Sequence, residues 1–296
     1  PHRGELSGMG IPKGITLIAG GGYHGKSTLL KALEMGVYNH IAGDGREYVI
    51  TDSTALKLRA EDGRYIEDTD ISLFINDLPN GKDTTHFTTE DASGSTSQAA
   101  GIVEGIFSGC HAFLIDEDTS AANFMVRDEL MQSVIHRKKE PITPFIERAR
   151  QLFDELGIST ILVAGSSGAF FHIADTVIQM DSYRPVDITE KVRETLKAFP
   201  SPVKSSEAAP AFRMPDASRP YRVNGKRIAD GKVKFFDRDS FSIDKNTVNL
   251  HYVEQIADSE QTAALAYILR YSCCVAARHI RRLKEEGSLQ NQYRLP

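Results

Sequence analysis

Gly20-Gly21-Gly22-Tyr23-His24-Gly25-Lys26-Ser27-Thr28 is the stretch that decides the fold. It fits the pattern G-x-x-x-x-G-K-[ST], in which Gly20 and Gly25 are the fixed glycines. Apolar residues 15–19 before it predict a short buried strand, and residues 28–34 after it predict the start of a helix. In this setting the backbone N–H groups and the positive end of the helix dipole favour phosphate. We therefore predict a nucleoside triphosphate site, the alternative being a glycine-rich turn that binds nothing.

A second motif supplies acids. Apolar residues 112–115 predict a buried strand that ends in Asp116, Glu117 and Asp118. We expect Lys26 to reach the β- and γ-phosphates, and Ser27 and Asp116 to hold Mg²⁺. A glutamate beside the metal-binding aspartate can orient or deprotonate the attacking water. The alternative for such an acidic strand end is a solvated turn or a cap for the next helix.

Composition sets the class of protein. The 296 residues allow one large domain or two ordinary ones, and 41% hydrophobic with 25% charged residues predicts a soluble globular protein. No apolar run approaches the roughly 20 residues that span a bilayer, and we see no signal peptide. Three cysteines without metal spacing favour a reducing, cytoplasmic location. Because the chain opens at Pro1 without a Met, we expect a fragment that lacks its N-terminal part.

The remaining pattern alternates strands and helices, which predicts an α/β domain with a mostly parallel sheet over residues 1–199. Further strands are expected at 47–51, 160–164 and 176–180. A Ser/Gly loop over 92–100 is expected to run into a helix that ends at Phe107, and further helices are expected at 125–138, 141–156 and 169–174. Residues 57–90 are interpreted as an irregular insertion. Residues 200–220 contain five prolines and predict a linker. Residues 221–296 predict a small α+β region, with a hairpin around Asn224-Gly225 and a helix over 253–285.

Several segments together resemble a known family. Ser93-Gly94-Ser95 resembles a variant of the ABC signature loop, and residues 116–123 resemble a Walker B strand end followed by a D-loop. Residues 162–180 resemble the segment that follows the ABC switch histidine. The whole stretch 8–187 is similar to the uncharacterised "predicted ATPase of the ABC class" family. The resemblance implies a P-loop NTPase of ABC type that binds and hydrolyses ATP with Mg²⁺.

The chain departs from the ABC pattern at two points. Gly165 and Ser166 stand where transporters carry the switch histidine, so the γ-phosphate contact passes to the Ser166 hydroxyl or is lost. No glutamine occupies the Q-loop position. Asn76 is the best substitute there and a third metal-ligand candidate, the alternative being an ordinary loop residue. His24 is interpreted as a residue that shapes the phosphate loop. The short stretch between Lys26 and Ser93 makes coupling to a membrane domain doubtful.

Two kinds of partner follow. If the ABC arrangement holds, Ser93 and the N–H groups of Gly94 and Ser95 form an outward anion site that meets the ATP of a second copy, which predicts an ATP-dependent head-to-tail homodimer. Basic clusters at residues 137–139 and 278–284 favour either a solvated helix end or an RNA or DNA groove. Two other functions remain open: a nucleic-acid-binding module that uses ATP only to dimerise, and a nucleotide sensor with negligible turnover.

Overall fold

The computed structural model describes residues 5, 7–127, 134, 140–199, 211–215 and 231–285, with side chains in the last helix described as far as residue 275. The chain divides into two compact units, Pro1–Ala217 and Ser218–Pro296, and each is considered by itself. Among the described residues, no helix has the length and apolar character needed to cross a membrane.

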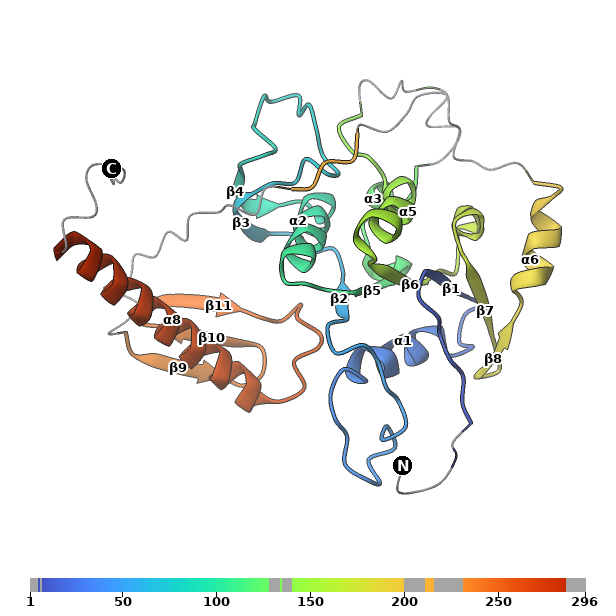
Figure 1. The fold of residues 1–296 in the computed structure, drawn as a ribbon, viewed down its shortest axis with the longest axis horizontal. Helices are drawn as coiled ribbons and strands as arrows, with labels where there is room; N and C mark the ends of the chain where they lie inside the picture. Colours follow the sequence, from blue (N-terminus) through green and yellow to red (C-terminus); the bar gives the residue numbers. More distant parts are fainter. Residues whose placement is uncertain are drawn as a thin grey trace. The chain divides into compact units, whose positions relative to one another are not determined.

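A six-stranded sheet organises the first unit, with the strand order β2-β5-β6-β1-β7-β8 (Figure 1). Its strands are β1 (Ile15–Ala19), β2 (Leu56–Leu58), β5 (Ala112–Asp116), β6 (Ser159–Val163), β7 (Thr176–Asp181) and β8 (Arg184–Asp187). All neighbours are parallel except β7 and β8, which form an antiparallel hairpin. The predicted mostly parallel sheet is therefore confirmed. Because parallel strands point the same way, the loops after β1, β5 and β6 share one edge of the sheet.

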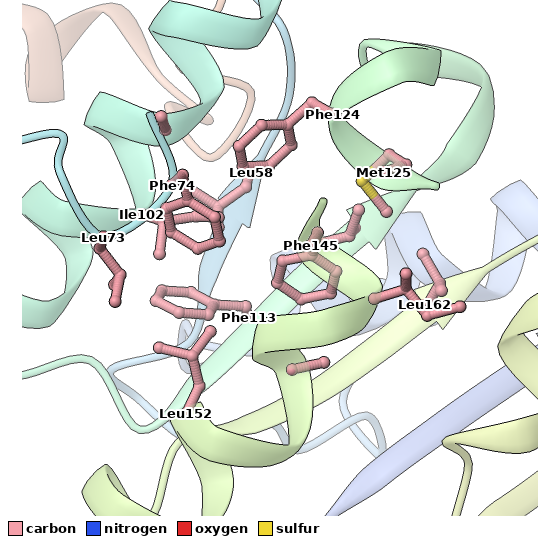
Figure 2. Close-up of a cluster of buried hydrophobic side chains, with 14 of the residues drawn as sticks. Leu58, Leu73, Phe74, Ile102, Phe113, Phe124, Met125, Phe145, Leu152 and Leu162 are labelled. Carbon is pink, nitrogen blue, oxygen red and sulfur yellow. The ribbon is translucent and has the colours of Figure 1, made fainter. Parts of the chain in front are cut away.

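Helices cover both faces of this sheet (Figure 1). One face carries α1 (Lys26–Met35), and the other carries α2 (Gly94–Phe107), α3 (Ala122–Met125) and α5 (Phe145–Leu156). Successive strand residues point to opposite faces, so Leu17 joins the core under α2 and α5 while Ile18 joins the core under α1. Figure 2 shows the larger core, in which the rings of Phe74 and Phe124 contact each other at a tilt of 51°, with centroids 5.0 Å apart.

Two sequence predictions for residues 47–90 are wrong. Residues 47–51 form no strand, and Tyr48 and Ile50 are 61% and 87% exposed; β2 takes the sheet edge instead. Residues 57–90 are more regular than expected, because β3 (Arg64–Thr69) and β4 (Phe87–Ala92) pair antiparallel. Irregular register between these strands disrupts the alternation that would reveal them in the sequence.

Helix boundaries also differ from prediction. The segment expected to be a helix over 169–174 is the 3₁₀ helix η3 (Gly168–His172), and a short α6 (Thr189–Leu196) follows β8. α3 ends at Met125, where the predicted helix over 125–138 was to begin, and most of that range lies outside the described residues. α5 starts at Phe145, four residues later than predicted, and ends at Leu156 as predicted, where Gly157 with a φ of +70° caps it.

The second unit is a small antiparallel sheet with one long helix. The sheet has the order β11-β10-β9, formed by β9 (Val233–Phe236), β10 (Ser240–Ile243) and β11 (Asn246–Asn249). Helix α8 (Ser259–Glu285) packs Ala266 against Phe241 and Ile243. It begins six residues later than predicted, after Asp258 accepts a bond from the Glu260 backbone. The predicted hairpin at Asn224-Gly225 lies outside the described residues.

Candidate nucleotide site

The loop between β1 and α1 needs glycine at both fixed positions of its motif. Gly20 has φ +143°, and a β-carbon there would lie 2.6 Å from the Met180 carbonyl oxygen. Gly25 has φ +96°, and a β-carbon would lie 2.7 Å from the Tyr183 ring. Side chains are disfavoured at these dihedrals and excluded by these distances. α1 then begins at Lys26, so the loop leads directly into a helix N-terminus.

The turn between β7 and β8 holds the other side of this loop. Ser182 N donates to His24 Nδ1 at 2.9 Å, and Tyr183 N donates to the His24 carbonyl at 3.1 Å. Ser182 and Tyr183 both have positive φ, which is the geometry of a two-residue hairpin turn. His24 thus joins the phosphate loop to a segment more than 150 residues away in sequence. Sequence reasoning expected His24 to shape the loop but did not identify the turn that it contacts.

The remaining loop residues face the sheet edge or solvent. Lys26 Nζ donates to the Gly21 carbonyl at 2.9 Å, across the loop. A β-carbon on Gly165 would lie 3.5 Å from the same nitrogen, so the lysine lies beside the loop after β6. Ser27 and Thr28 are exposed in the first turn of α1. Tyr23 is 99% exposed and Gly22 is also exposed.

The acid pair, Asp116 and Glu117, contacts the loop after β6 through Glu117. Asp116 ends β5, is 7% exposed and accepts a bond from Asp118 N at 3.2 Å. Glu117 begins the 3₁₀ helix η1 (Glu117–Thr119), and its Oε2 accepts bonds from Gly165 N at 3.0 Å and Ser166 N at 3.1 Å. β6 lies between β5 and β1 in the sheet. The loop after β6 therefore connects the acidic end of β5 to the lysine that follows β1.

Asn76 occupies a different setting. It follows the apolar turn Ile71–Ile75, where its Nδ2 donates to the Ser72 carbonyl at 2.7 Å and its backbone N donates to the Pro141 carbonyl at 2.9 Å. Within the described part of the chain, no hydrogen bond links Asn76 to Ser27 or Asp116. A metal role for Asn76 remains a prediction.

The start of α2 differs from the outward anion site expected there. Ser93 is exposed, and its hydroxyl contacts Thr96 Oγ1 at 3.0 Å. The Gly94 N–H already donates to Asp62 Oδ1 at 2.7 Å. Asp62 reaches this position because the neighbouring Ala60 N bonds the Thr119 carbonyl, which holds the β2–β3 connection against η1. A carboxylate of the same chain therefore lies where we expected phosphate.

The oxygen donors at this edge of the sheet suit a Mg²⁺ ion that is bound together with phosphate. Ser27 contributes a hydroxyl and Asp116 a carboxylate, which are hard oxygen ligands. Among the described residues, no group of three or more His, Cys, Asp or Glu could hold a metal by itself. Mg²⁺ commonly takes only one or two protein carboxylates and completes its shell with substrate phosphates and water, so these residues fit the ion.

Comparison with known proteins covers most of the chain. Residues 1–215 match the model of the ABC_ATPase family, a P-loop domain, and residues 232–290 match the model of the MRB1590 C-terminal domain. The uncharacterized protein MJ1628 of Methanocaldococcus jannaschii is 32% identical over 183 residues, which are 61% of this chain and 40% of that protein. The chain thus spans less than half the length of this relative.

Two solved structures are also similar. One is cbiO1 from Clostridium perfringens, part of the ABC transporter complex cbiONQ, at 16% identity and a TM-score of 0.40, covering 63% of this chain and 82% of that one. The other is MJ1267, an ATP-binding cassette of an ABC transporter in its ADP conformation, at 13% identity and a TM-score of 0.40, covering 62% and 84%. The family match spans well over half of the chain and includes the phosphate loop, Asp116, Glu117 and the loop after β6. The chain belongs to the ABC_ATPase family of P-loop domains.

Proposed function

We propose that this chain binds ATP with Mg²⁺ and hydrolyses it, using residues from three neighbouring strands. The proposal depends on one observation: the Glu117 carboxylate accepts hydrogen bonds from the backbone N–H groups of Gly165 and Ser166, beside Lys26. Both bonds fall on Glu117 Oε2, so they fix the direction of this carboxylate. No other acid in the described residues is bonded to the loop after β6.

Each residue then has one task. The backbone N–H groups of residues 20–25 and the Lys26 ammonium bind the phosphates. Ser27 and Asp116 hold Mg²⁺, which neutralises charge on the phosphate oxygens. Glu117 accepts a proton from the water that attacks the γ-phosphorus. Ser166 contributes its exposed hydroxyl as the γ-phosphate contact in place of the switch histidine.

Phosphate release tests the proposal. Glu117→Gln should retain ATP affinity and lower kcat by about 100-fold or more, the loss typical of a general base. Lys26→Ala should weaken ATP binding by roughly 10- to 100-fold, because it removes a charged hydrogen bond to phosphate. Asp118→Asn is the matched control, since Asp118 is the adjacent, exposed acid and should leave kcat nearly unchanged. A Glu117→Gln variant that turns over like wild type would exclude Glu117 as the base.

We further propose that ATP joins two copies head to tail. Ser93 is exposed at the start of α2, a 14-residue helix whose positive end favours phosphate. Ser93→Arg should abolish both the dimer and turnover while the monomer still binds ATP. Sedimentation of Glu117→Gln with Mg²⁺-ATP measures this, and a variant that stays monomeric at tens of micromolar refutes the proposal.

Nucleic acid is the partner class that we propose for the basic residues. Residues 137–139 lie outside the described residues, as do the side chains of residues 278–284, although the backbone of the latter forms the last turns of α8. Arg278, Arg281 and Arg282 follow i, i+3, i+4 spacing, which brings residues to one side of a helix. RNA and DNA affinity should fall steeply with salt, and reversing the charge of Arg281 and Arg282 should weaken binding to all sequences alike. If neither RNA nor DNA binds at low salt, the basic residues are only a solvated helix end.

A further inference from the structure

Helix α2 buries one amide side chain in an apolar setting. Gln98 is 0% exposed, and the next two residues, Ala99 and Ala100, are equally buried. An amide removed from water costs free energy unless its donors and acceptors are bonded. The partners of Gln98 therefore show what the helix is built to hold.

Those partners lie in the turn that follows the acid pair. Gln98 Nε2 donates to Ser120 Oγ at 3.0 Å, and Gln98 Oε1 accepts from Ala121 N at 3.0 Å. Nε2 also lies 3.4 Å from Met125 Sδ, a side chain of the core shown in Figure 2. One amide thus holds two consecutive residues of the turn, and α3 begins directly after them.

The same turn leads back to the acids. Ser120 Oγ donates to the Asp116 carbonyl at 2.8 Å, and Ser120 N donates to the Glu117 carbonyl at 3.2 Å. Gln98 is therefore one hydrogen-bonded residue away from both Asp116 and Glu117. These bonds hold the main chain from which the Asp116 and Glu117 side chains project, and loss of such supporting contacts around metal ligands commonly lowers activity.

A second bond supports the same connection. Ser95 lies three residues before Gln98, on the same side of α2, and its hydroxyl donates to Asn123 Oδ1 at 2.9 Å. The first turns of α2 and residues 120–123 are thus joined at two points. A displacement at the start of α2 would be transmitted to the acid turn through these bonds.

We propose that Gln98 is a positioning residue that holds the main chain of the turn carrying Asp116 and Glu117, a role that rests on the proposed ATPase function. Without its amide, Ser120 Oγ and Ala121 N each lose a partner, and the turn that carries the acids relaxes. The phosphate loop has no such dependence, because it is held by β7–β8. Loss of Gln98 therefore reduces turnover and metal use more than nucleotide binding.

The first test compares Gln98→Leu with Val103→Ala, which also changes a fully buried residue of α2 but removes no hydrogen bond. Gln98→Leu should lower kcat by about 10- to 100-fold, as for other residues that orient metal ligands, while the Kd for ATP measured without Mg²⁺ changes little. Val103→Ala should lower the thermal midpoint and leave kcat within about twofold of wild type. Equal effects of the two variants on kcat would overturn the proposal.

Gln98→Glu separates positioning from mere packing. A buried glutamate has a raised pKa, and its protonated form offers a donor to Ser120 and an acceptor to Ala121, as the amide does. The ratio of its kcat to that of wild type should rise several-fold from about pH 8 to about pH 6. A Gln98→Glu protein whose kcat at about pH 6 is no higher than that of Gln98→Leu would overturn the proposal.

Metal use gives a readout that does not depend on turnover. Mg²⁺ should strengthen ATP binding relative to EDTA in wild type and Val103→Ala, and this enhancement should be largely lost in Gln98→Leu. If wild type binds Mg²⁺-ATP but does not hydrolyse it, the hydrolytic function fails while this comparison still tests Gln98. If wild type shows neither turnover nor Mg²⁺ enhancement, both proposals are overturned, because Gln98 then has no acid function to position.

Discussion

Two glycines of α2 should respond in opposite ways to the same substitution. A β-carbon on Gly105 would lie 2.7 Å from Cε1 of Phe113 and 3.0 Å from Cδ2 of Leu56. On Gly101 the nearest atoms are Cδ2 of Leu58 at 3.5 Å and Nη1 of Arg64 at 3.7 Å, which is ordinary contact. Alanine is favoured over glycine in a helix interior by about 1 kcal/mol. Gly101→Ala should therefore raise the free energy of unfolding by about 0.5–1 kcal/mol.

Gly105→Ala meets a rigid neighbour. Phe113 is 0% exposed in β5, so its ring cannot move without displacing the core around it (Figure 2). Overpacking costs about 1–3 kcal/mol, and the gain in helix propensity offsets about 1 of this. We expect Gly105→Ala to lower the free energy of unfolding by up to about 2 kcal/mol, so that the two variants differ by roughly 0.5–3 kcal/mol.

Urea unfolding of the full chain, followed by far-ultraviolet circular dichroism, measures this difference. The double variant Gly105→Ala with Phe113→Leu should recover part of the loss, because the smaller side chain vacates the contact. A Gly105→Ala protein at least as stable as Gly101→Ala would refute the reasoning. The result also concerns function, since Gly105 allows α2 to approach the strand that ends in Asp116.

Three further predictions follow from single contacts. Asp62→Ala removes the carboxylate bonded to Gly94 N and should lower the dissociation constant of the ATP-dependent dimer about tenfold. Sedimentation measures this constant, and an unchanged value would show that the carboxylate does not compete with phosphate. Burial raises the pKa of Asp175, but its hydrogen bonds, including one from Arg150, outweigh burial and leave the pKa below its usual value. The Asp175 carboxylate, which is 40% exposed, should contribute about 1 kcal/mol to the free energy of unfolding. This contribution is present above roughly pH 4 and is lost as the pH falls through the folded pKa. Asp175→Asn should remove this pH dependence in acid urea titrations, and an unchanged pH profile would contradict the prediction. His24→Ala should weaken ATP binding by about fivefold through loss of the contact with the β7–β8 turn, about 1 kcal/mol; nucleotide titration measures this, and wild-type affinity would show that the turn does not hold the loop.

Local chemistry was readable from the sequence. The phosphate loop lies between a buried strand and a helix, and β1 has the predicted bounds because its five residues are nearly all buried. β5 likewise begins at Ala112 as predicted and contains the four apolar residues before the acids, but it ends at Asp116, and Glu117 and Asp118 belong to η1. These features depend on neighbours in the chain, and short-range patterns report them directly.

Other local patterns were misleading. Residues 47–51 have strand composition, but no neighbouring strand covers them, and Ile50 is left exposed. β3 and β4 were not identified, because their pairing has irregular register and joins segments separated by a long connection. Strand formation depends on a pairing partner, and the sequence of a strand does not identify that partner.

The members of the candidate site were predicted from the sequence, but the contacts among them were decided only by tertiary structure. Lys26, the pair Asp116 and Glu117, and Ser166 lie on three segments that are far apart in the chain. The insertion of β6 between β5 and β1 is what joins Glu117 to Gly165 and Ser166 and brings Gly165 beside Lys26. The order of parallel strands is set by the packing of crossover helices, which local patterns do not encode. For the same reason Gln98 looked like one more helix residue, and its bonds to Ser120 and Ala121 exist only because α2 packs against the end of β5.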